Sequence, residues 1–431
     1  MGIEPAYKVL KKFGLSAKKL LIPYYWVPYN FGFGRALPPI SVNLELTFRC
    51  NLRCQMCSLV VSNAVVTGGF PMNRDEEGVD PATLRGDEME YPEYAKLLDE
   101  MKAIGVKKIN ITGGEPLIKK DATKIIRHAK RNGFWVTMIT NGTVMTDEVC
   151  EALVSSGLDS MTVSLDGPEK IHNEIRGSEA GFSRLKKNVL KLQEWKKKAG
   201  VEKPRVLFSC AVSAMNQMAL SEIIDVAEEC EVKTVNYGYL FFSEESTIKA
   251  TDLITLTGQS DYADQRVPMH LREVNLDVMK QEMRLARSKA AAKGIRVEFN
   301  PPLEEHELDE RFNATEYFYT NKCFLPWYET RVNPFGDIYS CQIDTRLGNV
   351  REKSLREIWN DQPYKDFRRL IKAHALLPKC SRCCKLNDRT WNYLPRFSFG
   401  RPKKSRAPQA VAPGMVQIGS VRGPKLGSPP S

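Results

Sequence analysis

Three cysteines near the start of the chain are spaced closely enough to share one metal site. The segment reads Cys50-Asn-Leu-Arg-Cys54-Gln-Met-Cys57 and follows a short apolar run. Thiolates are soft ligands that suit iron–sulfur clusters and zinc. A structural zinc site needs four closed ligands, but the next cysteine along the chain is Cys150. Three thiolates on a four-iron cluster leave one iron open for chemistry, so the spacing favours a [4Fe–4S] cluster over zinc.

The other cysteines form a second group and three isolated residues. The second group consists of Cys323, Cys341, Cys380, Cys383 and Cys384. Cysteines of a large chain without a secretory signal stay reduced, so clustered ones indicate metal rather than disulfides. The isolated cysteines, Cys150, Cys210 and Cys230, lie in apolar surroundings. We expect these three to be small buried side chains.

The composition is that of a soluble globular protein, with 42% hydrophobic and 27% charged residues among 431. No apolar run approaches the roughly 20 residues that span a bilayer, and the N-terminus lacks the pattern of a secretory signal. We therefore expect a cytoplasmic protein. Residues 396–431 carry seven Lys or Arg and no acid, which is more than half of the net charge of +11. The remaining charge and the absence of a recognisable module argue against nucleic-acid binding.

The first 40 residues form a distinct segment with two interpretations. Apolar residues from Leu10 to Leu21 fall at helical spacing, with lysines largely on the other face, and an aromatic stretch follows at 24–31. A basic amphipathic helix with aromatics can lie on an anionic membrane surface, which would give a peripheral membrane contact. Alternatively, the segment packs against the main domain as a cap. Packing is favoured because it accounts for every apolar residue.

Strand and helix patterns alternate between residues 41 and 242. The predicted strands are 42–48, 109–112, 135–140, 161–165, 206–212 and 234–241, with helices between them that include 91–104 and 123–131. Such alternation predicts a parallel sheet built from right-handed βαβ units. Periodicity alone leaves open a full or partial barrel and an open doubly wound sheet. A helix at 273–293 and a strand at 295–299 complete this core, which ends near residue 300.

Two insertions, 58–90 and 243–271, follow strand ends. Because an α/β barrel places its active site at the carboxyl ends of its strands, both are candidates for substrate-covering loops. Plain surface loops are the alternative. Residues 317–391 hold the second cysteine group, and the Pro-, Gly- and Ser-rich tail at 396–431 is predicted to be disordered.

Further motifs follow the later strands in order. They are Gly113-Gly114-Glu115-Pro116 after the second strand, Thr140-Asn141-Gly142 after the third, and Ser164-Leu165-Asp166-Gly167 after the fourth. With the CxxxCxxC triplet, they make the chain closely resemble the radical S-adenosylmethionine (SAM) superfamily. The resemblance implies a partial (β/α)6 TIM-type barrel with SAM at the carboxyl ends of the strands.

The resemblance also implies roles for individual residues. The motif 113–116 would contact the SAM amino group, since glycines allow close backbone approach and a carboxylate or carbonyl can accept from an ammonium. The other SAM-binding residues that it implies are Asn141, Ser164, Asp166, Arg176 and Asn216. Arg176 would pair with the SAM carboxylate, and Asn216 would face the adenosine.

The second cysteine group resembles the C-terminal extension of SPASM and Twitch radical SAM enzymes. Gly336 and Asp337 would make a hairpin between strands at 329–332 and 338–340. The full SPASM pattern continues with cysteines for a second auxiliary cluster, whereas only Cys384 follows Cys383 here. This implies one auxiliary [4Fe–4S] cluster in a Twitch-like C-terminal domain. Its implied ligands are Cys323, Cys341, Cys380 and Cys383, with Cys384 as the alternative to Cys383. From the residues alone, a zinc ribbon remains the alternative.

The family resemblance implies a mechanism in which the cofactors carry the chemistry. A flavodoxin or ferredoxin would reduce the first cluster, SAM would be cleaved to a 5′-deoxyadenosyl radical, and a substrate hydrogen atom would be abstracted. The auxiliary cluster would assist oxidation or bond formation, or bind the substrate. The substrate remains open among small molecules, lipids and peptides, with the N-terminus slightly favouring an amphiphilic one, and no acid–base or hydrogen-donating residue is identified. The rival hypothesis is a non-enzymatic zinc-binding protein with an α/β scaffold.

Overall fold

The structure is a computed structural model that describes residues 21–57, 88–255, 267–341 and 345–396. Four predictions fall wholly or partly outside these ranges. They concern the helix before residue 21, most of the insertion at 58–90, the middle of the insertion at 243–271, and the tail after residue 396.

A single sheet of ten strands runs through the described residues. The strands are β1 (Ser41–Glu45), β2 (Lys108–Thr112), β3 (Trp135–Thr140), β4 (Ser160–Ser164), β5 (Arg205–Val212), β6 (Thr234–Tyr239), β7 (Arg296–Asn300), β8 (Glu329–Val332), β9 (Asp337–Tyr339) and β10 (Arg346–Asn349). Their order is β10-β9-β8-β1-β2-β3-β4-β5-β6-β7. The pairs from β8–β1 through β6–β7 are parallel, and the pairs β8–β9 and β9–β10 are antiparallel.

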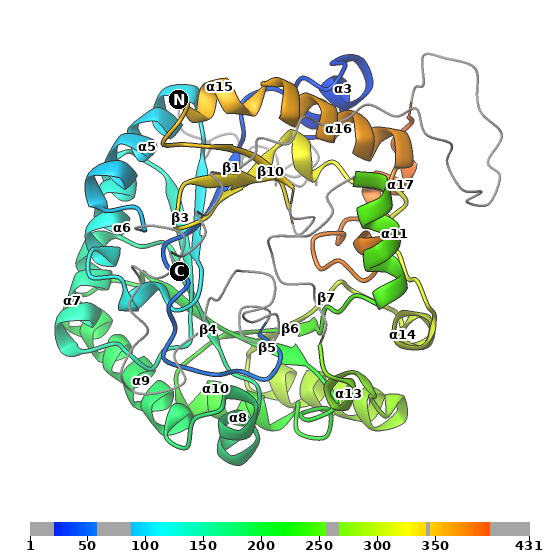
Figure 1. The fold of residues 1–431 in the computed structure, drawn as a ribbon. Helices are drawn as coiled ribbons and strands as arrows, with labels where there is room; N and C mark the ends of the chain where they lie inside the picture. The colour runs from blue at the N-terminus through cyan, green and yellow to red at the C-terminus, as the bar shows by residue number, and fades with distance from the viewer. Residues whose placement is uncertain (1–20, 58–87, 256–266, 342–344, 397–431) are drawn as a thin grey trace, which may run out of the picture.

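The parallel core confirms the predicted alternation, because β1 to β6 match the six predicted strands and β7 matches the predicted strand at 295–299. Strand β7 pairs only with β6, so the sheet does not close. Figure 1 shows the sheet curving into an incomplete ring with helices on its outside. This is the partial barrel that the resemblance implied.

Seven helices follow the strands around the ring. They are α5 (Tyr91–Ile104), α6 (Ala122–Arg131), α7 (Asp147–Ser156), α8 (Glu169–Arg176), α9 (Gly181–Lys198), α10 (Glu222–Glu229) and α13 (Leu276–Ala292). Helix α5 has the predicted bounds, begins with a capping box between Glu90 and Glu93, and ends at Gly105 in the left-handed conformation. Its buried face consists of Tyr94, Leu97, Leu98 and Met101, as its helical periodicity predicts.

The remaining helices lie near the C-terminal part of the chain or over the ring. They are α3 (Ile22–Phe31), α11 (Glu245–Thr255), α12 (Met269–Arg272), α14 (Glu305–Asn313), α15 (Leu355–Trp359), α16 (Gln362–His374) and α17 (Thr390–Tyr393). Among the described helices, none is long and apolar enough to cross a lipid bilayer.

The aromatic N-terminal segment forms α3, which packs on the C-terminal part of the chain. The ring of Tyr29 lies 4.6 Å from that of Phe324 and 4.8 Å from that of Trp327, in edge-to-face contacts. The ring of Tyr25 lies 5.0 Å from that of Phe324. The described part of this segment is therefore a cap, which is the favoured interpretation.

The C-terminal cysteine-rich part shares the sheet of the barrel. Strand β8 pairs in parallel with β1, from Ser41 opposite Glu329 to Leu44 opposite Val332. The predicted β8–β9 hairpin is confirmed, with Gly336 at a φ of +86° in its turn. The Asn333 Oδ1 atom accepts from the backbone N–H groups of two turn residues, Phe335 and Asp337, a contribution that we did not predict.

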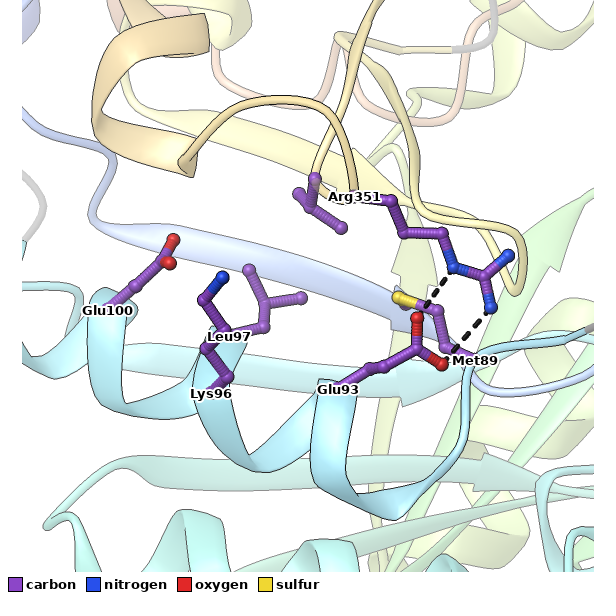
Figure 2. A pocket seen from close by; sticks show the side chains of 7 residues that line it. Met89, Glu93, Lys96, Leu97, Glu100 and Arg351 are labelled. Atoms are coloured by element: carbon purple, nitrogen blue, oxygen red, sulfur yellow. Dashed lines mark hydrogen bonds and ion pairs between the residues drawn. The ribbon is translucent and has the colours of Figure 1, made fainter.

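A second contact joins the two parts on the outside of the ring. A cavity of about 380 Å³ lies between α5 and the loop after β10. Figure 2 shows the side chains that line it. At its rim, Arg351 Nε donates to Glu93 Oε1 at 2.6 Å, and Arg351 Nη2 donates to Glu93 Oε2 at 3.1 Å. This bidentate ion pair fixes the position of the loop after β10 relative to α5, in addition to the strand pairing of the shared sheet.

Tyr29 tests how firmly the cap is attached. Its side chain is 1% exposed, and its hydroxyl has no hydrogen-bond partner. We expect Tyr29→Ala to lower the free energy of unfolding by about 3–5 kcal/mol, because it leaves a cavity. Tyr29→Phe should be neutral or stabilising, because it removes a buried, unsatisfied hydroxyl. Chemical denaturation of both variants measures this, and equal stability of Tyr29→Ala and the wild type would contradict it.

Candidate functional site

The first cysteine loop follows β1 and rests on the glycine turn after β2. Gly114 N donates to Thr47 O at 2.8 Å, and Glu115 N donates to Arg49 O at 2.9 Å. A Cβ atom added to Gly113 or Gly114 would lie 2.3 Å from the carbonyl oxygen of Thr47 or Arg49, respectively. Only glycine allows this approach, so the second motif fixes the backbone immediately before Cys50.

The end of α8 holds the other side of the same loop. Arg53 N donates to Arg176 O at 3.2 Å, and Gln55 N donates to Ile175 O at 2.9 Å. Gly177, at a φ of +63°, passes so close that an added Cβ would lie 2.7 Å from Arg53 O. The cysteine triplet is therefore clasped between the turn after β2 and the end of α8.

Glu115 is fully buried and links the glycine turn to the end of β3. Its carboxylate accepts from Thr140 Oγ1 at 2.8 Å, Asn141 N at 2.7 Å and Leu117 N at 3.1 Å. Burial raises the pKa of this carboxyl group, although these hydrogen bonds oppose the shift. The sequence left open whether a carboxylate or a carbonyl at this motif meets SAM. The structure commits the Glu115 carboxylate to bonds within the protein.

Asn141 extends from this turn to the cysteine loop. Its Nδ2 atom lies 3.0 Å from Asn51 Oδ1 and 3.8 Å from Cys50 Sγ. Asn51 Nδ2 in turn donates to Thr143 Oγ1 at 2.8 Å. The third motif is thus brought against the first, through an amide that points toward a thiol.

Asp166 and Arg176 form a buried ion pair beside the triplet. Arg176 Nε donates to Asp166 Oδ2 at 2.6 Å, and Arg176 Nη1 lies 3.6 Å from Cys54 Sγ. Burial alone would lower the pKa of Arg176, but the charges of Asp166 and of Cys54 reverse that effect and raise it. Within the protein Arg176 thus bonds Asp166 and lies beside a cysteine, and its pairing with the SAM carboxylate stays a prediction.

The predicted residues Ser164 and Asn216 come from the two strands next to this pair, Ser164 from β4 and Asn216 from the turn after β5. Ser164 ends β4 and is partly buried. Asn216 Nδ2 donates to Asp166 O at 2.9 Å, and Asn216 Oδ1 accepts from Ser213 N at 2.8 Å. The side chain of Asn216 therefore ties the end of β5 to the fourth motif.

Sequence reasoning missed His172, which is completely buried in α8. Its Nδ1 atom accepts from Asp166 N at 3.3 Å, and its Nε2 atom has no partner. Burial, with a smaller effect from the charge of Arg176, lowers the pKa of His172 to about 3. Its position four residues before Arg176, on one helical face, was the only pattern that could have indicated it.

The described part of the insertion at 243–271 covers the carboxyl ends of β5 and β6. His270 Nε2 lies 2.8 Å from Gln55 Oε1 in the cysteine loop, and Ala214 N donates to Leu271 O at 3.0 Å. A small apolar cluster fills this region, formed by Leu240, Phe242, Val267 and Leu271, with Met56, Met215 and Phe312 against it. This supports the covering-loop interpretation for residues 267–271. Residues 245–255 form α11, where Thr251 Oγ1 accepts from Lys379 N at 2.9 Å, next to the second cysteine group.

The other insertion contributes Glu88, at its described end. The Glu88 Oε1 atom accepts from Thr47 Oγ1 at 2.6 Å and from Phe48 N at 3.2 Å. Lys119 Nζ lies 3.4 Å from Glu88 Oε2. The chain therefore returns to the cysteine loop immediately before α5.

The second cysteine group comes together from three segments. The pKa of Cys323 is raised by burial and by its neighbours Cys380 and Cys341. Burial and then Cys341 raise the pKa of Cys380 to about 12. Thiols that raise one another's pKa in a buried site are stable as thiolates only with a cation, which fits an iron–sulfur or zinc group.

Cys383 and Cys384 differ in their surroundings. Cys383 is half-buried and Cys384 is exposed. Their hydrogen bond to each other is the largest effect on both thiols, and it raises the pKa of Cys383 and lowers that of Cys384 to about 6. Cys380 raises the pKa of Cys383 further, and Lys385 and Arg311 lower that of Cys384. Among the described His, Cys, Asp and Glu residues, no three side chains converge to hold a single metal ion. The first group fits a multi-iron site by the same chemistry, since burial and the neighbours Cys54, Glu115 and Cys57 raise the pKa of Cys50 to about 12.

The glycine turn gives a direct test of how the triplet is held. We expect Gly114→Ala to displace Arg49 and the loop behind it, so that metal is lost at the first cysteine group and kept at the second. Gly238→Ala is the control, because its Cβ would meet no atom closer than 3.9 Å. Metal analysis of anaerobically purified protein measures both, and full metal content in Gly114→Ala would contradict the role of the turn.

The buried His172 should make the free energy of unfolding fall at acidic pH. Its folded pKa of about 3 lies below the ordinary value of 6.5, so the unfolded chain takes up the proton first as the pH falls. The free energy of unfolding should be highest above pH 6.5. Below that pH, His172 should lower it by about 1.4 kcal/mol for each pH unit. Denaturation midpoints of the wild type and His172→Gln between pH 7 and 5 measure this, with a shallower slope expected in the variant. Equal slopes would contradict the assignment.

Comparison with known proteins agrees with both halves of this arrangement. Residues 44–202 match the model of the radical SAM superfamily, and residues 323–384 match that of the iron–sulfur cluster-binding SPASM domain. The AdoMet-dependent heme synthase of Methanosarcina barkeri is 25% identical over 80% of this chain and 88% of its own. A tungsten-containing aldehyde ferredoxin oxidoreductase cofactor-modifying protein of Pyrococcus furiosus is 24% identical over 79% of this chain and 86% of its own.

A solved structure shares the fold. SuiB of Streptococcus suis, bound to S-adenosylmethionine, superposes with a TM-score of 0.51 at 18% identity, over 78% of this chain and 69% of its own. The clasped CxxxCxxC loop, the motifs that surround it and the two family matches lead to one conclusion. The chain is a radical SAM enzyme with a C-terminal SPASM domain.

Proposed function

We propose that this enzyme cleaves SAM reductively with a [4Fe–4S] cluster held by Cys50, Cys54 and Cys57. It would then abstract a hydrogen atom from a cofactor-type small molecule, and one auxiliary cluster would help to oxidise that molecule. The observation that carries the proposal is the clasped loop. Its backbone is fixed on both sides, and polar side chains lie beside two of its sulfur atoms, Asn141 at Cys50 and Arg176 at Cys54. Bound at this loop, the cluster and SAM supply one-electron cleavage of the sulfonium.

The residues of the chain position and shield this chemistry. Arg176 carries a positive charge beside Cys54, and Asp166 orients its guanidinium. Asn216 and Ser164, next to that pair, would bound the SAM pocket. The apolar cluster around Phe242 and Leu271 lies at the same end of the barrel. There it would exclude water and so protect reactive species from side reactions.

The second cysteine group would hold the auxiliary [4Fe–4S] cluster through Cys323, Cys341, Cys380 and Cys383. The lower exposure of Cys383 and the effect of Cys380 on its pKa support it over Cys384 as the fourth ligand. A flavodoxin or a ferredoxin is the proposed electron donor. The cofactor-type substrate is supported by the two relatives, which are named for heme synthesis and for cofactor modification.

Cys54→Ala tests the SAM-cleaving step. We expect the variant to lose 5′-deoxyadenosine formation with SAM and dithionite while it retains the second cluster, because a ligand of the first cluster is missing. Cys230→Ala, in the core away from both groups, is the matched control and should cleave SAM normally. Chromatographic detection of 5′-deoxyadenosine measures both, and continued cleavage by Cys54→Ala would overturn the assignment.

Iron content tests the number of clusters. Two four-iron clusters give about eight irons per chain. We expect Cys383→Ser to lose about half of this iron and Cys384→Ser to keep it all. A colourless protein that contains zinc would contradict the proposal and support the non-enzymatic alternative.

A further inference from the structure

Phe242 lies where the two cysteine groups approach each other. It follows β6, and its apolar cluster includes Met56 from the first cysteine loop. The Cζ atom of Arg382, inside the second cysteine loop, lies 4.5 Å from the centre of the Phe242 ring. Arg272 Cζ, from α12, lies 5.0 Å from the same centre. One aromatic ring thus contacts two arginines at the carboxyl end of the barrel.

A third arginine, Arg311 of α14, is hydrogen-bonded to the backbone around the end of β6 and to Arg382. Its Nη2 atom donates to Tyr239 O and Leu240 O at 3.4 Å and to Arg382 O at 3.3 Å. Arg382 Nε donates back to Arg311 O at 2.7 Å. The two side chains therefore fasten the second cysteine loop to the end of β6. In Figure 1, α11, α14 and α17 lie together on this side of the ring.

Positive charge exceeds negative charge among these residues. Arg311 and Arg382 are 1% and 2% exposed, and among the described residues no carboxylate lies at ion-pair distance from either. Burial and the charge of Arg382 lower the pKa of Arg311 to about 10. The nearest acidic influences on Arg382 are Glu244 and Glu316. Two buried guanidinium groups bonded mainly to carbonyl oxygens create a strong positive potential.

Hydrogen-bond donors also outnumber acceptors here. Arg311 Nε and Arg272 Nε are both buried without a partner. Arg272 reaches the surface more than the other two arginines, with 16% of its side chain exposed. Its only carboxylate partner in the described part of the chain is Glu244, at 3.1 Å from Nη1. Three guanidinium groups thus meet one bound carboxylate, and two of their Nε donors remain without an acceptor.

We propose that the substrate bears a carboxylate or phosphate group, which binds Arg272 beside Phe242 in the field of Arg311 and Arg382. Charge-assisted hydrogen bonds from a guanidinium suit both oxyanions. Arg272 is the contact residue, because Arg382 donates to carbonyl oxygens and positions the loop. The bound oxyanion would hold the substrate between the two cysteine groups. This inference rests on the proposed function and narrows its substrate class.

Replacing Glu244 should change oxyanion binding in opposite directions, depending on whether Arg272 binds the substrate or only forms a structural salt bridge. As the internal partner of Arg272, Glu244 competes with an incoming oxyanion for the same guanidinium. Glu244→Gln should therefore bind oxyanions several-fold more tightly than the wild type. If Arg272 and Glu244 only hold the covering segment in place, the same change would weaken or abolish binding.

Equilibrium dialysis of the anaerobically purified holoenzyme with SAM, against labelled glutarate and labelled phosphate, tests the proposal. We expect saturable binding of at least one of the two anions, and the preferred one assigns carboxylate or phosphate to the substrate. Arg272→Gln should weaken this binding at least about tenfold, as expected for a lost charge-assisted bond, and Arg272→Lys should restore part of it. Arg205→Gln is the control, because Arg205 is exposed at the opposite end of β5, and its binding should be unchanged.

No saturable binding of either anion would overturn the inference, as would equal binding by Arg272→Gln or weaker binding by Glu244→Gln. Iron content confirms that each variant is folded and loaded. Formation of 5′-deoxyadenosine by the same wild-type preparation separates the two proposals. A wild type that cleaves SAM but binds neither anion contradicts only the substrate class, whereas one that fails to cleave SAM contradicts the proposed function.

Discussion

Strand β1 is hydrogen-bonded along both edges, and both cysteine groups take their positions from this strand. On one edge, β2 ends in the glycine turn that supports the loop of Cys50. On the other edge, β8 begins the hairpin that leads to Cys341. Because the register of parallel pairing fixes where each strand ends, the two metal-binding segments cannot shift relative to each other without breaking the sheet.

Much of this arrangement could be predicted from the sequence. The cysteine triplet, the motif at 113–116 and the strand–helix alternation are local patterns, and each has a direct physical meaning. The helical face of α5 and the hairpin at Gly336 are of the same kind. Their positions in the structure agree with these predictions.

Other features depend on contacts between distant segments, which no local pattern reveals. The pairing of β8 with β1 joins residues almost 300 positions apart and makes one sheet from two expected domains. His172 and Arg311 look like ordinary helix-surface residues in the sequence, yet both are buried. No local pattern reveals that three donors from the ends of two strands converge on the carboxylate of Glu115.

The occupied edge of β1 also determines which parts of this enzyme can be exchanged between relatives. Without β8, the five-residue strand β1 would present unpaired backbone N–H and C=O groups, a template for pairing with other chains. A fragment that ends before residue 317 would therefore be prone to aggregate rather than behave as a smaller enzyme. Chimeras of this family should carry β1 and the β8–β9 hairpin from the same parent, although almost 300 residues separate them.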